Sequence, residues 1–184
     1  MAPVILRPTS TTSYTGFNTN PYPPAADNNP GTSATQNNIT CNWTAVLEDL
    51  DSSLSGATIN SFAISAVASA GRAGACQASL MLVHSTDGAF ASELESWTSS
   101  TTTQTTTART TQQDGSSALT YAYINNCSVK IDPNAQGITL YELLVTVDYT
   151  AATGYGNIVN GVAAANIGKV NGVATADISK VNGV

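Results

Sequence analysis

The feature that most constrains this chain is the alternation of side-chain types in residues 138–150, ITLYELLVTVDYT. Large apolar or aromatic residues recur at every second position, which is the period of a β-strand and not the 3.6-residue period of a helix. Successive side chains of a strand point to opposite faces of its sheet. The segment therefore predicts one long strand, buried on its odd-numbered side: Tyr141, Leu143, Val145, Val147 and Tyr149.

Three further segments read as strands. Residues 75–85 alternate so that Cys76, Ala78, Leu80 and Leu82 share one face, which predicts a central strand. Residues 57–70 are apolar with a mixed period. Residues 98–112 contain nine threonines in fifteen positions, which fits either a low-complexity tract or a strand. We favour the strand, because a sandwich whose next strand begins near residue 119 needs a partner here.

Turn-forming clusters separate these segments, among them 85–88 (STDG) and 132–137 (DPNAQG). Only 44–54 and 121–126 have the composition of short helices. The pattern predicts an all-β chain, an antiparallel β-sandwich or jelly roll of about seven to nine strands. We expect a strand ending at Pro8 and a Pro-rich arm within 1–35, a sandwich over 36–150 completed by strand 1–8, and a stalk or linker over 151–184.

Charge is scarce: only 10% of residues are charged and the net charge is −6, against roughly 25% charged in an average soluble domain. Six basic residues without a cluster argue against nucleic acid as a partner. The chain contains no apolar run of the length that crosses a membrane, and its first residues do not form a secretory signal. A surface made polar by Thr, Ser, Asn and Gln favours packing against other protein copies.

No catalytic constellation is evident in the sequence. His84 is the single histidine, no serine lies in a G-x-S-x-G elbow, and Glu93 and Glu95 read as a solvated face. Cys41, Cys76 and Cys127 lack the spacing of a zinc site and read as buried thiols. We therefore predict no enzyme activity and no cofactor.

Two acidic segments are candidates for calcium binding through carboxylate oxygens. The segment 132–137 begins like an EF-hand loop, but Leu143 stands where the twelfth-position glutamate is required. The segment 48–53, EDLDSS, has three carboxylate residues among its six positions. The first reads as a turn, and no metal site is predicted.

Carbohydrate binding would need exposed aromatic rings as stacking platforms. The candidates are Trp43, Trp97, Tyr121 and Tyr123. Packing in the core or against another subunit is the alternative for each of them.

Three segments together resemble a known kind of β-sandwich: APVILRPTS at the start, DGSSALTYAYINNCSVKI in the third quarter and LYELLVTVDYT at 140–150. They are similar to structural proteins of tailed bacteriophage virions, of the capsid-decoration and head- or tail-fibre types. In that resemblance Asp114-Gly115-Ser116 is a turn, 120–125 a one-turn helix and 127–131 the strand that follows. The aromatic residue usual after the turn is replaced by Ala118-Leu119. The resemblance implies architecture and setting, and it supplies no catalytic residues.

The tail carries the tripeptide Asn-Gly-Val at Asn160, Asn171 and Asn182, spaced by 11 residues. Three interpretations stay open: strand–Asn-Gly–strand hairpin units, a helix with an 11-residue apolar repeat, or a flexible linker. In all three, we expect association with sister chains to order the tail, and a trimer is favoured. The positions expected to carry that association are Ile167, Val170, Val173, Ile178, Val181 and Val184.

These observations predict a non-enzymatic structural protein of a tailed-phage particle, assembled in the host cytoplasm. It would decorate or cement the capsid or form the base of a fibre, with capsid or tail proteins as partners. The alternative is a module of a tail fibre that binds carbohydrates of the host surface.

Overall fold

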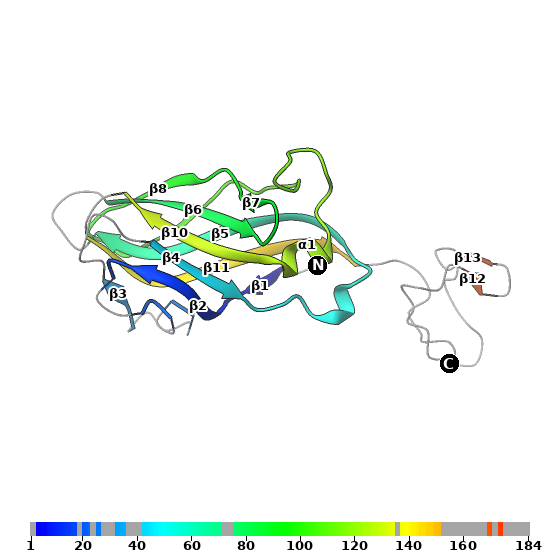
Figure 1. Ribbon diagram of the computed structural model, residues 1–184, viewed down its shortest axis with the longest axis horizontal. Helices are drawn as coiled ribbons and strands as arrows, with labels where there is room; N and C mark the ends of the chain where they lie inside the picture. Colours follow the sequence, from blue (N-terminus) through cyan, green and yellow to red (C-terminus); the bar gives the residue numbers. More distant parts are fainter. Residues whose placement is uncertain are drawn as a thin grey trace.

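The computed structural model describes residues 3–17, 20–22, 25–26, 32–35, 42–70, 76–134, 137–151, 169–170 and 173–174. Two antiparallel sheets pack face to face over a single apolar core, which confirms the predicted all-β sandwich (Figure 1). In Figure 1 the sheet that contains β2, β4, β10 and β6 lies in front of the sheet that contains β5 and β11.

Sheet A runs in the order β1 (Val4–Leu6), β11 (Ile138–Thr150), β5 (Thr58–Ala70) and β9 (Thr102–Thr105), and β3 (Ala34–Thr35) also pairs with β11. Sheet B runs β2 (Pro8–Thr15), β4 (Asn42–Leu47), β10 (Cys127–Pro133), β6 (Cys76–His84) and β7 (Gly88–Ala89), and β8 (Glu93–Trp97) also pairs with β6. A 3-10 turn, η1 (Ser52–Leu54), and one short helix, α1 (Tyr121–Asn125), interrupt the strands. The strands predicted in 57–70, 75–85 and 138–150 are thus present as β5, β6 and β11, whereas only Thr102–Thr105 of the predicted segment 98–112 forms a strand, β9.

The long strand β11 differs from its prediction in one respect, because its register against β5 shifts between Leu140 and Glu142. Such a bulge inserts an extra residue and reverses which side of the strand faces inward. Ile138 and Leu140 are therefore buried before the bulge, and Leu143, Val145 and Val147 after it. Tyr141 and Tyr149, expected on the buried side, are only half-buried.

The N-terminal segment joins both sheets. β1 pairs with β11 in sheet A, the chain crosses at Arg7, and β2 then pairs with β4 in sheet B. The prediction that the first strand ends at Pro8 is wrong, because Pro8 begins a second strand. Proline lacks the backbone donor but is tolerated as the first residue of an edge strand.

The described part of the Pro-rich arm contacts this chain's own sandwich. Ala25 is fully buried, its N–H donates to the carbonyl of Pro21 at 2.9 Å, and its carbonyl accepts from the N–H of Leu143 at 2.9 Å. Tyr22 packs against the core from the same segment. At least these residues of the arm close one side of the sandwich.

Of the two short helices predicted, one is confirmed. α1 begins after Thr120, whose hydroxyl accepts from the N–H of Tyr123 at 3.1 Å, the hydrogen bond of an N-cap. The segment 44–54 instead continues β4 and forms η1, with Asp51 as its N-cap. Trp43, Ala45 and Leu47 alternate into the core, and this period of two outweighs the helical spacing of Val46, Leu47 and Leu50.

In the tail, β12 (Lys169–Val170) and β13 (Val173–Ala174) pair antiparallel with Val170 opposite Val173. Two residues separate the paired positions, as in the hairpin interpretation of this repeat. Ile167, Ile178, Val181 and Val184 lie outside the described residues, so the predicted association of the tail stays a prediction. Within the described ranges, no helix has both the length and the apolar character needed to cross a membrane.

Candidate functional site

Two of the four predicted stacking aromatics are core residues. Trp43 is 0% exposed and Trp97 is 1% exposed. The indole of Trp43 donates to the hydroxyl of Thr11 at 2.9 Å, and that of Trp97 donates to the carbonyl of Thr102 at 3.1 Å. Neither ring has a face available to a sugar, so the prediction of exposed stacking platforms is wrong for both.

The other two aromatics come from α1 and differ in exposure. Tyr123 is only 7% exposed, its ring stacks on His84 with centroids 3.9 Å apart, and its hydroxyl accepts from the N–H of Gln113 at 3.2 Å. Burial raises the pKa of Tyr123 above its ordinary value. Tyr121 is half-buried, and its hydroxyl donates to the carbonyl of Leu50 at 3.1 Å. Tyr121 is therefore the least buried of the four candidates.

His84 lies at the end of β6 and is 9% exposed, which matches the prediction of a strand-end histidine. Its Nδ1 atom lies 3.3 Å from the backbone nitrogen of Asp87 and 3.3 Å from the Asp87 carboxylate. Cys127 is paired with His84 across β10 and β6. Burial, with a smaller contribution from Asp87, raises the pKa of the Cys127 thiol to about 12. The thiol therefore stays protonated at neutral pH and is not an activated nucleophile.

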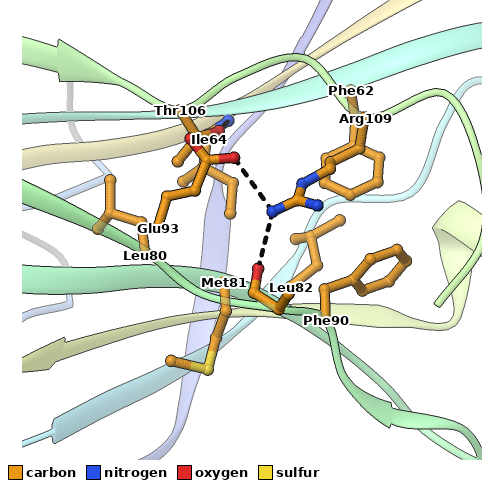
Figure 2. A pocket seen from close by; sticks show the side chains of 10 residues that line it. Phe62, Ile64, Leu80, Met81, Leu82, Phe90, Glu93, Thr106 and Arg109 are labelled. Atoms are coloured by element: carbon orange, nitrogen blue, oxygen red, sulfur yellow. Dashed lines mark hydrogen bonds and ion pairs between the residues drawn. The ribbon is translucent and has the colours of Figure 1, made fainter. Parts of the chain in front are cut away.

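A small pocket lies between the sheets at the side formed by β8 and the segment after β9 (Figure 2). Its volume of about 10 Å³ holds roughly one water molecule. Arg109 closes it by donating to the Glu93 carboxylate at 3.1 Å and to the carbonyl of Ala91 at 3.2 Å, as Figure 2 shows. The walls are mostly apolar: Phe62, Ile64, Leu80, Leu82 and Phe90. This pocket is too small to hold a sugar or another organic substrate.

The acidic pair on β8 also has a structural explanation. Glu93 accepts from the N–H of Thr107 at 2.7 Å in addition to its ion pair with Arg109. Burial, and then the neighbouring charge of Glu93, raise the pKa of Glu95. Glu93 thus fastens β8 of sheet B to the segment that follows β9 of sheet A.

The two candidate calcium segments are likewise engaged in local contacts. Glu48 accepts from the N–H of Arg7 at 2.8 Å, Asp51 caps η1, and Asp132 pairs with Lys130 at 2.8 Å. Among the residues that the structure describes, no cluster of three or more His, Cys, Asp or Glu side chains is arranged to hold a metal ion.

Three of the six basic residues have side chains that the structure describes, and each of the three is paired with a carboxylate. In the described part of the chain, Arg7 pairs with Glu142 at 3.5 Å, Arg109 with Glu93 and Lys130 with Asp132. The outer surface of sheet A carries the charged side chains of Glu142 and Asp148, and the strand register brings a set of uncharged residues together on the same surface. Ile5, Thr146 and Ala63 form one row, Leu144, Ser65 and Thr105 a second, and Val67 and Thr103 extend a third.

We call these eight residues the neutral face. None of them is longer than leucine, and five are alanine, serine or threonine. Ser65 and Thr105 contact each other through their hydroxyl oxygens at 2.8 Å. The face is bordered by Glu142, held by Arg7, and by Asp148, which accepts from the amide of Asn60 at 3.1 Å. The sequence did not reveal this surface, because its members are far apart along the chain and only the strand register brings them together.

Comparison with known proteins gives limited similarity. No protein-family model and no curated protein matches the chain. Among solved structures, the C-terminal CBM6 of LamC, a marine laminarinase from Zobellia galactanivorans, is 10% identical over 79% of this chain and 99% of that one, with a TM-score of 0.48. A carbohydrate-binding module of Cellvibrio mixtus lichenase 5A, in complex with cellotriose, is 12% identical over 82% and 99%, with a TM-score of 0.45. At these values neither similarity identifies a function for this chain.

Proposed function

We propose that this chain is a non-enzymatic structural protein of a tailed-phage particle, in which the sandwich packs against other virion proteins of the capsid or of a fibre base. The observation that carries the proposal is the neutral face, a part of the outer surface of sheet A formed by short, uncharged side chains. The resemblance of the three segments in the first, third and last parts of the sandwich to virion proteins supplies the setting.

The physical reason is the low cost of covering such a surface. Short side chains such as Ala, Ser and Thr lose little rotamer entropy when a partner covers them, whereas Lys, Arg and Glu lose up to about 2 kcal/mol each. A surface without free charges also avoids the desolvation of ions, which is expensive unless each ion is paired. Permanent contact with another protein is therefore inexpensive for this face.

The proposal is tested by quantitative mass spectrometry of particles purified from a culture of the organism that encodes the chain. We expect the chain in the purified particles, in a fixed ratio to the major capsid or tail protein across independent preparations. Its absence from particles, with the chain found only in the soluble fraction, would overturn the proposal.

Carbohydrate recognition is the second candidate, and the half-buried position of Tyr121 is the observation that favours it. Asp49, Asp51 and Ser52 lie exposed in the segment adjoining Leu50, to which the Tyr121 hydroxyl is bonded. An aromatic ring is suited to stacking on a sugar, and nearby carboxylates and hydroxyls are suited to bonding its hydroxyls. Glycan binding would then depend on this end of the sandwich.

This second candidate is tested by calorimetric titration with cellotriose, the ligand present in the Cellvibrio mixtus complex, and by a glycan array. Tyr121→Ala should abolish any binding seen for the unaltered chain. Tyr14→Ala is the matched control, because Tyr14 is 44% exposed on the edge strand β2. Equal binding by both variants would exclude Tyr121 as the stacking residue, and no binding to any glycan would remove the candidate.

A further inference from the structure

We infer that His84 is a pH-dependent cap of the turn between β6 and β7, and that protonation of its ring exchanges one set of hydrogen bonds in the turn for another. This corner of the sandwich therefore carries a local switch that responds to mild acid. The switch depends on the contacts of one imidazole nitrogen and is independent of the proposed function.

The buried ring contacts the turn from its core side. His84 lies opposite Gly88 across the turn, so residues 85–87 connect the two strands. Gly88 has a φ of +84°, the left-handed conformation that often ends a three-residue hairpin loop. Residues 85–87 are exposed, whereas His84 is 9% exposed. The imidazole is thus placed to bond the backbone of the turn.

The Nδ1 atom of His84 has partners that require it to be unprotonated. The N–H of Asp87 donates to it at 3.3 Å, and the nitrogen of the Thr86 N–H lies at 3.5 Å. An N–H group can donate only to a ring nitrogen that carries no proton, so the neutral ring holds its proton on Nε2. In this state the ring is an acceptor that fixes the backbone of the turn.

The same atom also has a partner that requires it to be protonated. A carboxylate oxygen of Asp87 lies 3.3 Å from Nδ1, and a carboxylate can only accept. A proton on Nδ1 converts this contact into a charge-assisted hydrogen bond. The hydroxyl of Thr86 suits either state, because it lies 3.2 Å from Nδ1 and 3.1 Å from the other carboxylate oxygen of Asp87. Partners for both protonation states are therefore already in place, as a switch requires.

The exchange of partners leaves no buried donor behind. When the ring is protonated, the N–H groups of Thr86 and Asp87 lose their acceptor. Both residues are exposed, so water can bond these groups instead. The turn can therefore change its hydrogen bonds without unfolding the strands that it joins.

The neighbours of the ring favour its charged state. Tyr123 of α1 stacks on it with the centroids 3.9 Å apart and the planes 3° apart, and the face of an aromatic ring attracts a cation. Three titratable groups face the ring in the described part of the chain: Asp87, Tyr123 and Cys127 of β10. Burial raises the pKa of Tyr123, and it raises the pKa of the Cys127 thiol to about 12. Both stay uncharged near neutral pH, so Asp87 is the one of the three that can pair with the charged ring.

The test is an NMR titration of the full chain, in which His84 is the single histidine. Histidine is the side chain whose charge ordinarily changes between about pH 5 and 8. At the upper end of this range, the ring nitrogen signals should show the proton on Nε2. As the pH falls, the amide signals of Thr86 and Asp87 should shift with the same midpoint as the ring signals. A proton on Nδ1 of the neutral ring, or turn amides that do not follow the ring, would overturn the inference.

Two variants separate the roles of the ring and the carboxylate. In His84→Gln the amide shifts of the turn should disappear from this pH range, and their persistence would contradict the inference. Asp87→Asn removes the negative partner of the charged ring, so the shift of the Thr86 amide should occur at a lower pH than in the unaltered chain. Asp132→Asn is the matched control, since Asp132 pairs with Lys130 at the other end of β10 and should leave the midpoint unchanged.

Circular dichroism verifies that each variant is folded before its titration. If His84→Gln does not fold, the comparison of Asp87→Asn with Asp132→Asn still decides the outcome. An equal midpoint in these two variants would show that the Asp87 carboxylate is not the partner of the charged ring, and the inference would fall.

Discussion

Replacing Trp97 with alanine should lower the free energy of unfolding by about 3–5 kcal/mol, the range measured for removal of a buried tryptophan or phenylalanine side chain. The value follows from the position of the ring, which is 1% exposed and belongs to the same core as Trp43 and Phe62. A domain of this size loses roughly 2–4 °C of melting temperature for each kcal/mol. The expected fall is thus about 6–20 °C.

Trp97→Phe separates the two contributions to this loss. Phenylalanine keeps most of the buried apolar surface but cannot donate to the carbonyl of Thr102, which the indole contacts at 3.1 Å. Loss of that hydrogen bond costs about 0.5–1.5 kcal/mol, and the smaller ring adds a modest packing term. We expect a total loss of about 1–3 kcal/mol, clearly smaller than that of the alanine variant.

Urea denaturation followed by far-ultraviolet circular dichroism measures both variants. If Trp97 were instead an exposed platform for sugars, its removal would change stability by no more than about 0.5 kcal/mol, as for other surface substitutions. An alanine variant that unfolds at the same urea concentration and with the same slope as the unaltered chain would refute the core assignment.

Three further outcomes are expected. The hydroxyl of Ser117 and the N–H groups of Ser116 and Ser117 donate to Asp114 and hold its pKa at about 2, below the ordinary 3.8. Asp114→Asn should therefore be less stable than the unaltered chain above about pH 4. The two urea midpoints should converge as the pH falls through 2, and a difference that stays constant would contradict this. Glu93→Gln removes the ion pair with Arg109, in which the Glu93 side chain is 24% exposed and the Arg109 side chain 37%. Thermal melts should therefore show that the free energy of unfolding falls by at most about 1 kcal/mol. This difference should be smaller in 1 M NaCl, because salt screens the pair. Multi-angle light scattering should find the full chain trimeric and a chain ending at Thr150 monomeric; equal monomeric masses would argue against the tail as an oligomerising stalk.

The strands that were predictable from sequence are those with apolar alternation. β6 and β11 carry apolar residues at alternate positions, and in the structure these residues are buried in the same alternation, apart from the bulge in β11. The bulge in β11 was not predictable, because Leu140, Leu143 and Leu144 allow either phase of burial and only pairing with β5 selects one. The sequence pattern therefore predicted where the strand lies, but its pairing with β5 determines which of its residues face the core.

β2 shows the opposite case. Its sequence PTSTTSYT has almost no apolar side chains, so nothing in the local pattern distinguishes it from the Pro-rich arm. It forms because β4 offers an unpaired edge, and an exposed edge strand needs little apolar surface.

The sequence predicted the kind of residues that form the candidate surface, but not which residues they are. The scarcity of charge indicated a surface suited to packing, but which residues form it depends on the register of four strands. The burial of Trp43 could not be inferred either, since the hydroxyl that accepts from its indole belongs to Thr11, 32 positions away in the chain.

The pairing of β1 with β11 has a consequence for the order in which the chain is made. Val4 lies opposite Val147, and at roughly 5–20 residues per second a ribosome needs about 7–30 s to synthesise the segment between them. Pairings between such distant residues also slow folding itself. Residues 4–6 are thus translated before every other strand of the sandwich, yet their partner strand is translated last. In a product truncated before residue 145, β1 has no partner strand. The pairing of β1 in sheet A can therefore form only after β11 has been translated.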